Sequence, residues 1–457
     1  MIDSRQFITN SLSLVQLTPL STQIRGTGLM RPTMTLTPRG PYAQVRALAT
    51  TCIRWKNNSV PFASRFPASF VLPTAIPSVS RMVDAEAQQR RELLGLYDKL
   101  NLPPCLYAFA YGSGVFSQAP GADQSKRMID LIVAVQNPVL WHERNMVVHP
   151  DHYPWIVRVL GSWSIRRFQD MGGGLWYNPY ITAGDRVVKY GVTSLDTLCN
   201  DLLDWNTLYV AGRLQKPIAT LIDTTKGRVS LAMQVNLTSA LRVALLLLSE
   251  RFSERDLYLT IAELSYLGDF RMNIPGGENA NKIRNIVDNQ ASWFRIMCAD
   301  LIVRFGSVHV KTEKGPWMTL TQDTSSVSRA QLAARLPLNL RKHLIAYFVA
   351  RPDLSPVFAE AKESGAFAEP SRAPEPVQVG VANPSLSSRF WIAAVEQPDF
   401  KEVLRASIAD IVREPTRTQS LKGIYTAGIS RSIRYVWSKV TKVRFLLMQY
   451  MSGKRQK

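Results

Sequence analysis

Acidic residues are missing from both ends of this 457-residue chain, since no Asp or Glu occurs between Ser4 and Val83 and none follows Glu414. The first 83 residues carry nine basic side chains and one acid, and the last 43 carry ten basic side chains. The 331 residues between them have a net charge of only +2. A folded domain that binds nucleic acid spreads basic residues over one face. The near-neutral middle of the chain therefore argues against a nucleic-acid partner.

Cysteines and long apolar runs are also scarce. The cysteines, none of which forms a C-x-x-C pair, are Cys52, Cys105, Cys199 and Cys298. Their scatter argues against a disulfide framework and a cysteine zinc site, and favours a reducing compartment. The longest apolar stretches, such as 243–248 and 445–448, are far shorter than the roughly 20 residues that cross a bilayer. We therefore expect no integral membrane protein.

The N-terminal segment 1–83 has the composition of a mitochondrial transit peptide. It is rich in Arg, Ser and Thr, almost free of acids, and contains short apolar patches such as 12–17. A disordered basic tail has a similar composition, so this alternative stays open. In either case the segment is left out of the fold prediction.

The C-terminal segment 429–457 predicts a basic amphipathic helix. Apolar residues recur at spacings of three and four, and basic residues fall on the other side. The membrane-facing set comprises Ile433, Val436, Trp437 and Val440, flanked by Arg434 and Lys439. Such a helix can lie in the interface of an anionic membrane, and the absence of acids favours this over docking on the protein's own core.

The middle of the chain predicts a mixed α/β fold. A helix is expected over 83–100, followed by strands over 105–111, 128–135 and 187–192 and a helix-like segment over 196–205. Further helices are expected over 231–249 and 254–267, the second capped by Ser253. We divide the chain into 84–225, a mostly helical unit 226–350, a flexible Pro/Ala/Glu-rich insertion 351–390 with its core at 360–388, and a segment 391–428 that packs on the core.

A Gly-Ser-Gly turn and a buried-strand carboxylate suggest chemistry on nucleotides. The first strand ends in Gly112-Ser113-Gly114, and Asp130 lies between Ile129 and Leu131 on the second strand. Glycines let backbone N–H groups approach a triphosphate, and a carboxylate among apolar neighbours is costly unless a cation compensates it. This layout is typical of nucleotidyl transfer, with Mg²⁺ bridging phosphate oxygens.

Several short motifs make a family resemblance specific. In chain order they are Tyr111-Gly112-Ser113-Gly114-Val115-Phe116, Asp130, Trp141-His142, His152-Tyr153, Lys189-Tyr190-Gly191, Gly212-Arg213-Leu214-Gln215-Lys216-Pro217, Gly268-Asp269-Phe270-Arg271 and Lys422-Gly423-Ile424-Tyr425-Thr426-Ala427-Gly428. This order over about 105–430 resembles the mitochondrial translocator assembly and maintenance protein family.

The resemblance implies a fold, an activity and a location. The fold is a polymerase-β-type nucleotidyltransferase domain followed by a winged-helix-like domain and a C-terminal membrane-binding helix. The activity is that of a phosphatidate cytidylyltransferase, which makes CDP-diacylglycerol and pyrophosphate from CTP and phosphatidic acid for cardiolipin and phosphatidylglycerol synthesis. The implied location is peripheral, on the matrix side of the mitochondrial inner membrane.

One departure from the wider nucleotidyltransferase pattern concerns the metal ligands. That pattern places two acids at i and i+2 on one strand, whereas Ile132 follows Asp130 here and the distance along the chain from Ser113 is longer than usual. A second ligand must come from elsewhere. We name Asp201 as the first candidate and Asp204 as a weaker one, because either acid can instead face solvent or cap a helix.

The predicted roles follow from the substrates, because phosphatidate arrives ionised and needs no strong general base. The predicted catalytic residues are Asp130, Ser113, Lys189 and Asp201; the CTP-binding residues are Tyr111, Gly112, Ser113 and Gly114; the phosphate- or lipid-binding residues are Lys189, Arg213 and Lys216; and the Mg²⁺ ligands are Asp130 and Asp201. Each of the three cations can also be an ordinary surface charge.

Histidines and aromatic residues between 141 and 155 are interpreted as structural. His142, His149 and His152 lie close in sequence, but prolines interrupt them, so packing is favoured over zinc binding or a substrate contact by His152. The neighbouring aromatic residues, interpreted as core, are Trp141, Tyr153 and Trp155. Two other functions compete with lipid cytidylyl transfer: nucleotidyl transfer to RNA, and non-enzymatic assembly of the mitochondrial protein-import machinery.

Overall fold

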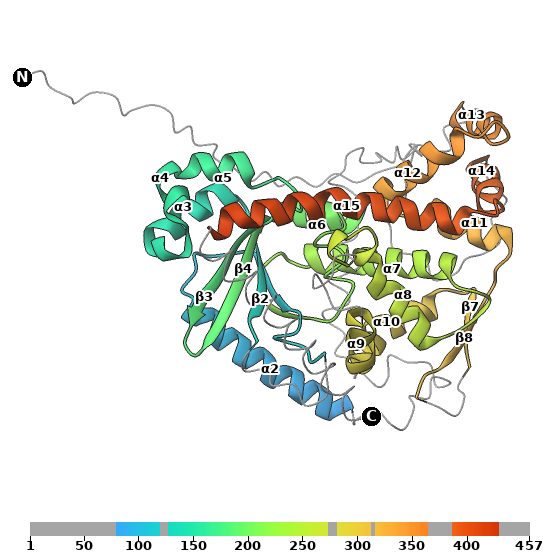
Figure 1. Cartoon of the computed structure of the whole chain (residues 1–457). Coiled ribbons are helices and arrows are strands. Elements are labelled where there is room, and N and C mark those ends of the chain that lie inside the picture. Colours follow the sequence, from blue (N-terminus) through green and yellow to red (C-terminus); the bar gives the residue numbers. More distant parts are fainter. Residues whose placement is uncertain (1–78, 119–126, 273–280, 312–315, 364–385, 429–457) are drawn as a thin grey trace, which may run out of the picture. The chain divides into compact units, whose positions relative to one another are not determined.

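The computed structural model describes residues 79–118, 127–272, 281–311, 316–363 and 386–428 (Figure 1). Most of the predicted leader, most of the predicted flexible insertion and the predicted membrane helix 429–457 lie outside the described residues. The mixed helix and sheet content confirms the α/β class.

A five-stranded mixed sheet forms the first part of the described structure. Its strands are β1 (Tyr107–Tyr111), β2 (Ile129–Val135), β3 (Trp176–Ala183), β4 (Arg186–Ser194) and β5 (Ile218–Asp223), in the order β3-β4-β2-β1-β5. Strands β2 and β4 pair in parallel, and the other neighbours are antiparallel. The strands expected at 105–111, 128–135 and 187–192 are confirmed as β1, β2 and β4. Strands β3 and β5 were not predicted.

Alternating residues divide the sheet into two buried faces. Phe109 and Ile132 face the larger core, which includes residues of α6 (Leu195–Asp204) and α7 (Arg228–Leu247). Leu131 and Val133 face a second core that includes residues of α2 (Val79–Lys99). The expected helices at 83–100 and 196–205 are confirmed as α2 and α6.

Helix α7 is long and apolar enough to cross a membrane by length and composition, but 72% of its most apolar window is buried inside the protein. Its buried residues join the same core as β1 and the later helices. We therefore assign α7 as a central core helix, which is the usual place of an apolar helix in a globular protein.

The region after α7 combines helices with a small sheet. The elements are β6 (Arg251–Ser253), α8 (Glu254–Glu263), η3 (Leu264–Tyr266), η4 (Phe270–Met272), α9 (Lys282–Asn289), α10 (Ala291–Arg304), β7 (Val308–Lys311), β8 (Thr319–Gln322), α11 (Ser326–Ala334), α12 (Leu338–Val349) and α13 (Ser355–Glu363). Ser253 caps α8 in a reciprocal capping box with Asp256, as predicted. The antiparallel sheet β6-β8-β7 was not predicted.

Two further helices, α14 (Leu386–Val395) and α15 (Phe400–Ala427), close the described chain. Helix α15 contacts α12 and also β3 of the large sheet. Glycines permit this approach, because a Cβ at Gly268 would lie 2.2 Å from the carbonyl oxygen of Ala409, and one at Gly172 would lie 2.9 Å from the backbone nitrogen of Gln419. The segment 391–428 is thus packed on the core along its length.

A helical excursion joins β2 to β3. It consists of α3 (Pro138–Val148), η2 (Pro150–His152), α4 (Trp155–Leu160) and α5 (Ser162–Phe168). Its inner side forms a small core of Tyr153, Val157, Ile165 and Trp176. Trp141 and Tyr153 are buried as predicted, but the prediction for Trp155 is wrong, because 66% of this residue is exposed. Its helix α4 is only one and a half turns long and buries the opposite side.

Candidate active site

Sheet register brings the three central residues of the site together. Tyr111 pairs with Asp130 across β1 and β2, and Asp130 pairs with Lys189 across β2 and β4. Directly opposed residues on neighbouring strands point to the same face. The predicted nucleotide-binding tyrosine, metal-binding carboxylate and catalytic lysine therefore lie in one row across the sheet.

The Gly-Ser-Gly turn lies close to this row because its two glycines have no side chain. Neither glycine can be replaced without strain. Gly112 has a φ of 81°, and a Cβ there would lie 3.4 Å from Oδ2 of Asp130. A Cβ on Gly114 would lie 2.4 Å from the carbonyl oxygen of Met128. The backbone N–H groups of Val115 and Phe116 both bond to the Gly112 carbonyl, which makes the turn compact. The turn is thus held against the start of β2.

Lys189 is held between a carboxylate and an aromatic ring. Its Nζ lies 3.4 Å from Oδ1 of Asp130 and 4.2 Å from the centroid of the Tyr177 ring. Burial disfavours the charged lysine, but Asp130 and neighbouring tyrosine hydroxyls outweigh burial and raise the pKa of Lys189 above its usual value. This lysine is therefore a permanent positive charge near neutral pH.

Arg213 adds a second cation supported by tyrosine rings. Its guanidinium carbon lies 4.0 Å from the Tyr209 ring centroid and 5.6 Å from the Tyr111 ring centroid. The Tyr111 and Tyr177 hydroxyls are 3.4 Å apart, which connects the two cation–aromatic pairs. Burial raises the pKa of Tyr111 to about 12, so its hydroxyl is neutral and can donate a hydrogen bond. We call Tyr111, Asp130, Lys189 and Arg213 the charged cluster.

Asp201, which was predicted to bind the metal ion, is occupied by hydrogen bonds from a neighbouring loop. Oδ1 accepts hydrogen bonds of 2.8 and 2.9 Å from the backbone N–H groups of Thr207 and Leu208, and Oδ2 accepts bonds of 2.9 Å from those of Val210 and Ala211. The Thr207 hydroxyl donates a further bond of 2.9 Å to Oδ1. A buried carboxylate with both oxygens so occupied has little capacity left for a metal ion. This geometry argues against the predicted metal role.

The loop that Asp201 holds carries part of the charged cluster. Tyr209 lies within it, and the loop leads directly into Arg213, whose guanidinium also donates to the Tyr209 carbonyl. Asp201 is therefore a positioning residue for Arg213. The weaker candidate Asp204 is buried at the end of α6, where its charge acts on Arg341 of α12.

Lys216 lies one turn beyond Arg213 and faces the second region. Its Nζ donates to the Ser265 hydroxyl at 2.9 Å and to the Gly212 carbonyl, and it lies 5.2 Å from the Tyr266 ring centroid. Burial, reinforced by the nearby charges of Arg213 and Lys282, lowers the pKa of Lys216 to about 7. An anionic ligand would stabilise the charged form of Lys216, because the neighbouring side chains carry like charge.

The predicted interpretation of the histidines is compatible with the structure. His142 is buried, its Nδ1 lies 2.7 Å from the Tyr153 hydroxyl, and burial lowers its pKa to about 3. His152 Nδ1 lies 2.8 Å from the Tyr190 hydroxyl. His149 stacks on His152, and with Asp151 these two offer ligand atoms within 4.8 Å of one another. His149 Nε2 also lies 2.9 Å from the Asn101 carbonyl, so its position is explained by packing.

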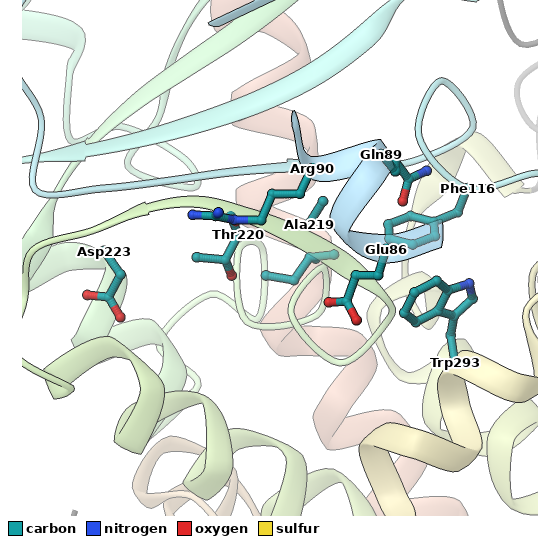
Figure 2. A pocket seen from close by; sticks show the side chains of 9 residues that line it. Glu86, Gln89, Arg90, Phe116, Ala219, Thr220, Asp223 and Trp293 are labelled. Atoms are coloured by element: carbon teal, nitrogen blue, oxygen red, sulfur yellow. The ribbon is translucent and has the colours of Figure 1, made fainter. Parts of the chain in front are cut away.

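A separate cavity of about 320 Å³ lies between α2, β5 and α10 (Figure 2). Phe116 and Trp293 meet edge to face at its rim, with ring centroids 5.6 Å apart. Arg90 lines the cavity, but its guanidinium donates to the carbonyls of Thr220 and Leu221. None of the predicted site residues lines this cavity. We place the site at the charged cluster, because that is where ionisable groups of opposite sign converge.

Sequence reasoning missed two aromatic residues of the site. Tyr177 and Tyr209 carry the rings beneath Lys189 and Arg213. Tyr209 lies four residues before Arg213, and a Cβ on Gly173 would lie 2.4 Å from its ring, so a glycine run allows the ring to fit. The spacing from Tyr209 to Arg213 was the available signal.

The sequence is similar to a known family of proteins. Residues 95–442 match the family described as "Phosphatidate cytidylyltransferase, mitochondrial". Proteins with that name are 37% identical over 340 residues in Danio rerio and 36% identical over 339 residues in Xenopus laevis, covering 74% of this chain and 90% of each relative. One from Schizosaccharomyces pombe is 35% identical over 353 residues, covering 74% of this chain and 80% of the relative.

The class that these matches define is that of the nucleotidyltransferases. More narrowly, the chain belongs to the mitochondrial phosphatidate cytidylyltransferase family. The family predicted from the motifs is thereby confirmed.

Proposed function

We propose that this chain transfers the cytidylyl group of CTP to phosphatidic acid in mitochondria, which yields CDP-diacylglycerol and pyrophosphate. The names of its relatives support the reaction and the location. The structural observation that carries the proposal is the contact between the Gly-Ser-Gly turn and Asp130, with Lys189 and Arg213 beside them. This combination offers backbone donors, a carboxylate and two cations to a triphosphate.

The arrangement of strands and helices supports the proposed domain types. The mixed sheet carries the turn at the end of β1 and the carboxylate on β2, as in a polymerase-β-type nucleotidyltransferase domain. The small sheet β6-β8-β7 with its neighbouring helices is compatible with a winged-helix-like domain. Buried residues from both parts form one core, which fixes the Lys216 side of the site to η3.

In the reaction, a phosphate oxygen of phosphatidate attacks the α-phosphorus of CTP. A new oxygen–phosphorus bond forms, the bond from the α-phosphorus to the bridging oxygen of the β-phosphate breaks, and pyrophosphate leaves with that electron pair. Gly112, Ser113 and Gly114 bind the triphosphate through backbone N–H groups and the serine hydroxyl. Lys189 and Arg213 offset charge on the phosphates, and Lys216 stabilises the departing pyrophosphate.

The donor set near the turn fits Mg²⁺. The Asp130 side chain is 25% exposed and its Oδ2 faces Gly112, so this carboxylate can be reached from the turn. Mg²⁺ commonly uses one or two carboxylates and takes its other ligands from substrate phosphates and water, so Asp130 with Ser113 is a sufficient protein contribution. When bound, the ion would neutralise charge on the triphosphate. Asp201 is not included.

The remaining expectations concern the membrane. The lipid substrate requires contact with a bilayer, and the basic amphipathic segment 429–457 is the proposed anchor on the matrix side of the inner membrane. Its membrane-facing residues Ile433, Val436, Trp437 and Val440 lie outside the described residues. Supply of CDP-diacylglycerol for cardiolipin and phosphatidylglycerol synthesis is the proposed role, and no nucleic-acid partner is proposed.

The reaction is tested with protein lacking residues 1–78, labelled CTP, phosphatidate vesicles and Mg²⁺. We expect labelled CDP-diacylglycerol from wild type and from Asp185→Asn, a control in the exposed turn between β3 and β4. We expect product from Asp130→Asn at a rate about 10²–10³-fold lower. Product from Asp130→Asn at the wild-type rate would overturn the metal assignment, and no product from folded wild type would favour the non-enzymatic assembly role.

A further inference from the structure

The outer surface of α4 and α5 is apolar and exposed. Trp155 is 66% exposed, Val159 74% and Trp163 58%, and Leu160 beside them is 40% exposed. Scattered exposed apolar residues are ordinary, but two tryptophans and two aliphatic residues within nine positions form a concentrated set. We call these four residues the apolar surface.

Poor packing does not explain the apolar surface, because each helix also has a fully buried apolar residue on its other side. Val157 of α4 and Ile165 of α5 are 0% exposed and pack with Tyr153 and Trp176. The excursion is also fixed to the sheet by buried polar bonds, including those of 2.8 Å from the Asn145 amide nitrogen to the Tyr153 and Tyr190 hydroxyls. The exposed side is therefore a stable feature of a well-anchored element.

Charge on the same helices favours an anionic partner. Arg158, Arg166 and Arg167 are exposed, and no Asp or Glu occurs between Pro154 and Gln169. Arginines that flank tryptophan and aliphatic side chains are typical of protein surfaces that lie in the membrane interface, where the rings sit at headgroup level and the cations meet lipid phosphates.

The position of the end of α15 gives an independent argument. A Cβ on Gly428 would lie 3.2 Å from the Pro154 ring, which directly precedes α4. The Tyr425 hydroxyl lies 2.8 Å from the Ser164 hydroxyl of α5. The end of α15 therefore lies against α5 and against the residue that precedes α4 (Figure 1 shows α15 ending near α3 and α5).

We infer that α4 and α5 form a second membrane-binding surface, which inserts Trp155, Val159, Leu160 and Trp163 into an anionic bilayer. Other occupants fit the charge less well. The segment 429–457 is itself basic and free of acids, and a second copy of the chain would bring arginines against arginines. The choice of a phosphatidate-containing bilayer rests on the proposed function.

Vesicle binding by the full chain tests the inference. The variant Trp155→Glu/Trp163→Glu is compared with Val327→Glu, which adds a charge at a 54% exposed apolar residue of α11. With phosphatidate/phosphatidylcholine vesicles and no CTP, flotation should show a partition coefficient reduced about tenfold or more for the double variant. The control should bind like wild type. Equal binding by all three proteins would overturn the inference.

A fluorescence measurement covers the case in which the double glutamate variant does not fold. Lipids brominated near the headgroup should quench wild-type tryptophan emission more than that of Trp155→Phe/Trp163→Phe, whose rings are retained. Trp437 is present in both proteins and cancels in the comparison. Equal quenching would overturn the inference, as would protection of both tryptophans from an aqueous quencher without vesicles, which would mean that another part of this chain or a second copy covers them.

The proposed membrane surface and the proposed reaction can be tested separately. Phosphatidylglycerol vesicles should support binding as phosphatidate vesicles do, and phosphatidylcholine alone should bind several-fold more weakly, because the arginines recognise negative charge rather than one headgroup. If wild type makes no CDP-diacylglycerol but the double variant loses vesicle binding, the proposed reaction fails and the membrane surface stands. The reverse result would remove the surface and keep the reaction.

Discussion

The charged cluster and the apolar surface depart from the usual distribution of side chains in opposite directions. At the cluster, Lys189 and Arg213 are half-buried against tyrosine rings, whereas at the surface Trp155 and Trp163 are exposed to water. Burying a charge costs free energy, which a ligand of opposite charge can offset. Exposing an apolar side chain to water also costs free energy, which insertion into a bilayer removes. Each departure thus points to its own class of ligand.

Both regions depend on buried polar bonds for their position. Asp201 fixes the loop before Arg213, and Asn145 fixes the excursion that carries α4 and α5. Hydrogen bonds between buried polar groups favour one arrangement of the backbone. Each region therefore contains residues that contact a ligand and residues that hold these in position. Mutations of the first group should mainly reduce ligand binding or activity, and mutations of the second group should mainly reduce stability.

Asp130→Asn should have the largest effect on the cluster. Loss of the carboxylate removes the proposed metal ligand, so we expect cytidylyl transfer to fall by about 10²–10³-fold. Stability should change by less than about 1 kcal/mol, because the side chain is partly exposed and its contact with Lys189 is 3.4 Å long. Labelled product formation and urea unfolding measure the two effects. A large loss of stability would show that Asp130 is structural.

Asp201→Asn should have the opposite profile. The amide presents N–H groups where one carboxylate oxygen now accepts two backbone N–H bonds, so we expect a loss of roughly 2–4 kcal/mol in unfolding free energy. Asp196→Asn on the same helix is the control, because its side chain is 65% exposed and should cost less than about 1 kcal/mol. A stable Asp201→Asn protein without activity would restore the metal role.

Lys216 should make anion binding depend on pH. Its pKa is lowered to about 7, so the charged form that attracts pyrophosphate is lost as pH rises through that value. We expect pyrophosphate affinity to fall about tenfold between pH 6 and 8.5, beyond any change in Lys216→Met, when followed by calorimetry. Lys342→Met, an exposed lysine of α12, should behave like wild type. Parallel pH profiles for wild type and Lys216→Met would contradict this assignment.

The lowered pKa of Lys216 also determines the direction in which stability changes with pH. The unfolded chain keeps the Lys216 proton up to an ordinary lysine pKa, whereas the folded chain releases it near pH 7. Between these values the unfolded state binds more protons, so the contribution of Lys216 to stability rises with pH. Lys216→Met should therefore gain most over wild type below pH 7, where the buried charge is fully present.

Local patterns predicted the elements that carry the site. Short apolar runs predicted β1 and β2, and the first of these runs ends at Gly112. Such a local pattern indicates a strand without knowledge of distant residues. Strand β3 and strands β5 to β8 were missed, since their conformation depends on neighbouring strands that only the fold supplies.

Asp130 and Asp201 show why the site was only partly predictable. Both are aspartates in predicted elements of the fold, and the sequence offered both as metal ligands. Their difference arises where the chain 207–211 folds back and directs four backbone N–H groups at one carboxylate. Trp155 gave the same difficulty, because an amphipathic pattern does not say which side of a short helix meets the core.

Tyr425→Phe should have the smallest effect and tests the link between α15 and the apolar surface. The change removes the 2.8 Å bond to Ser164 but keeps the ring, whose centroid lies 4.7 Å from that of Phe168. We expect a stability loss of about 1 kcal/mol, and faster amide hydrogen exchange in α5 because its opening becomes easier. Tyr347→Phe on α12 should leave exchange in α5 unchanged. If Tyr425→Phe also leaves it unchanged, α5 is held by its small core alone, and the end of α15 only lies beside the surface without supporting it.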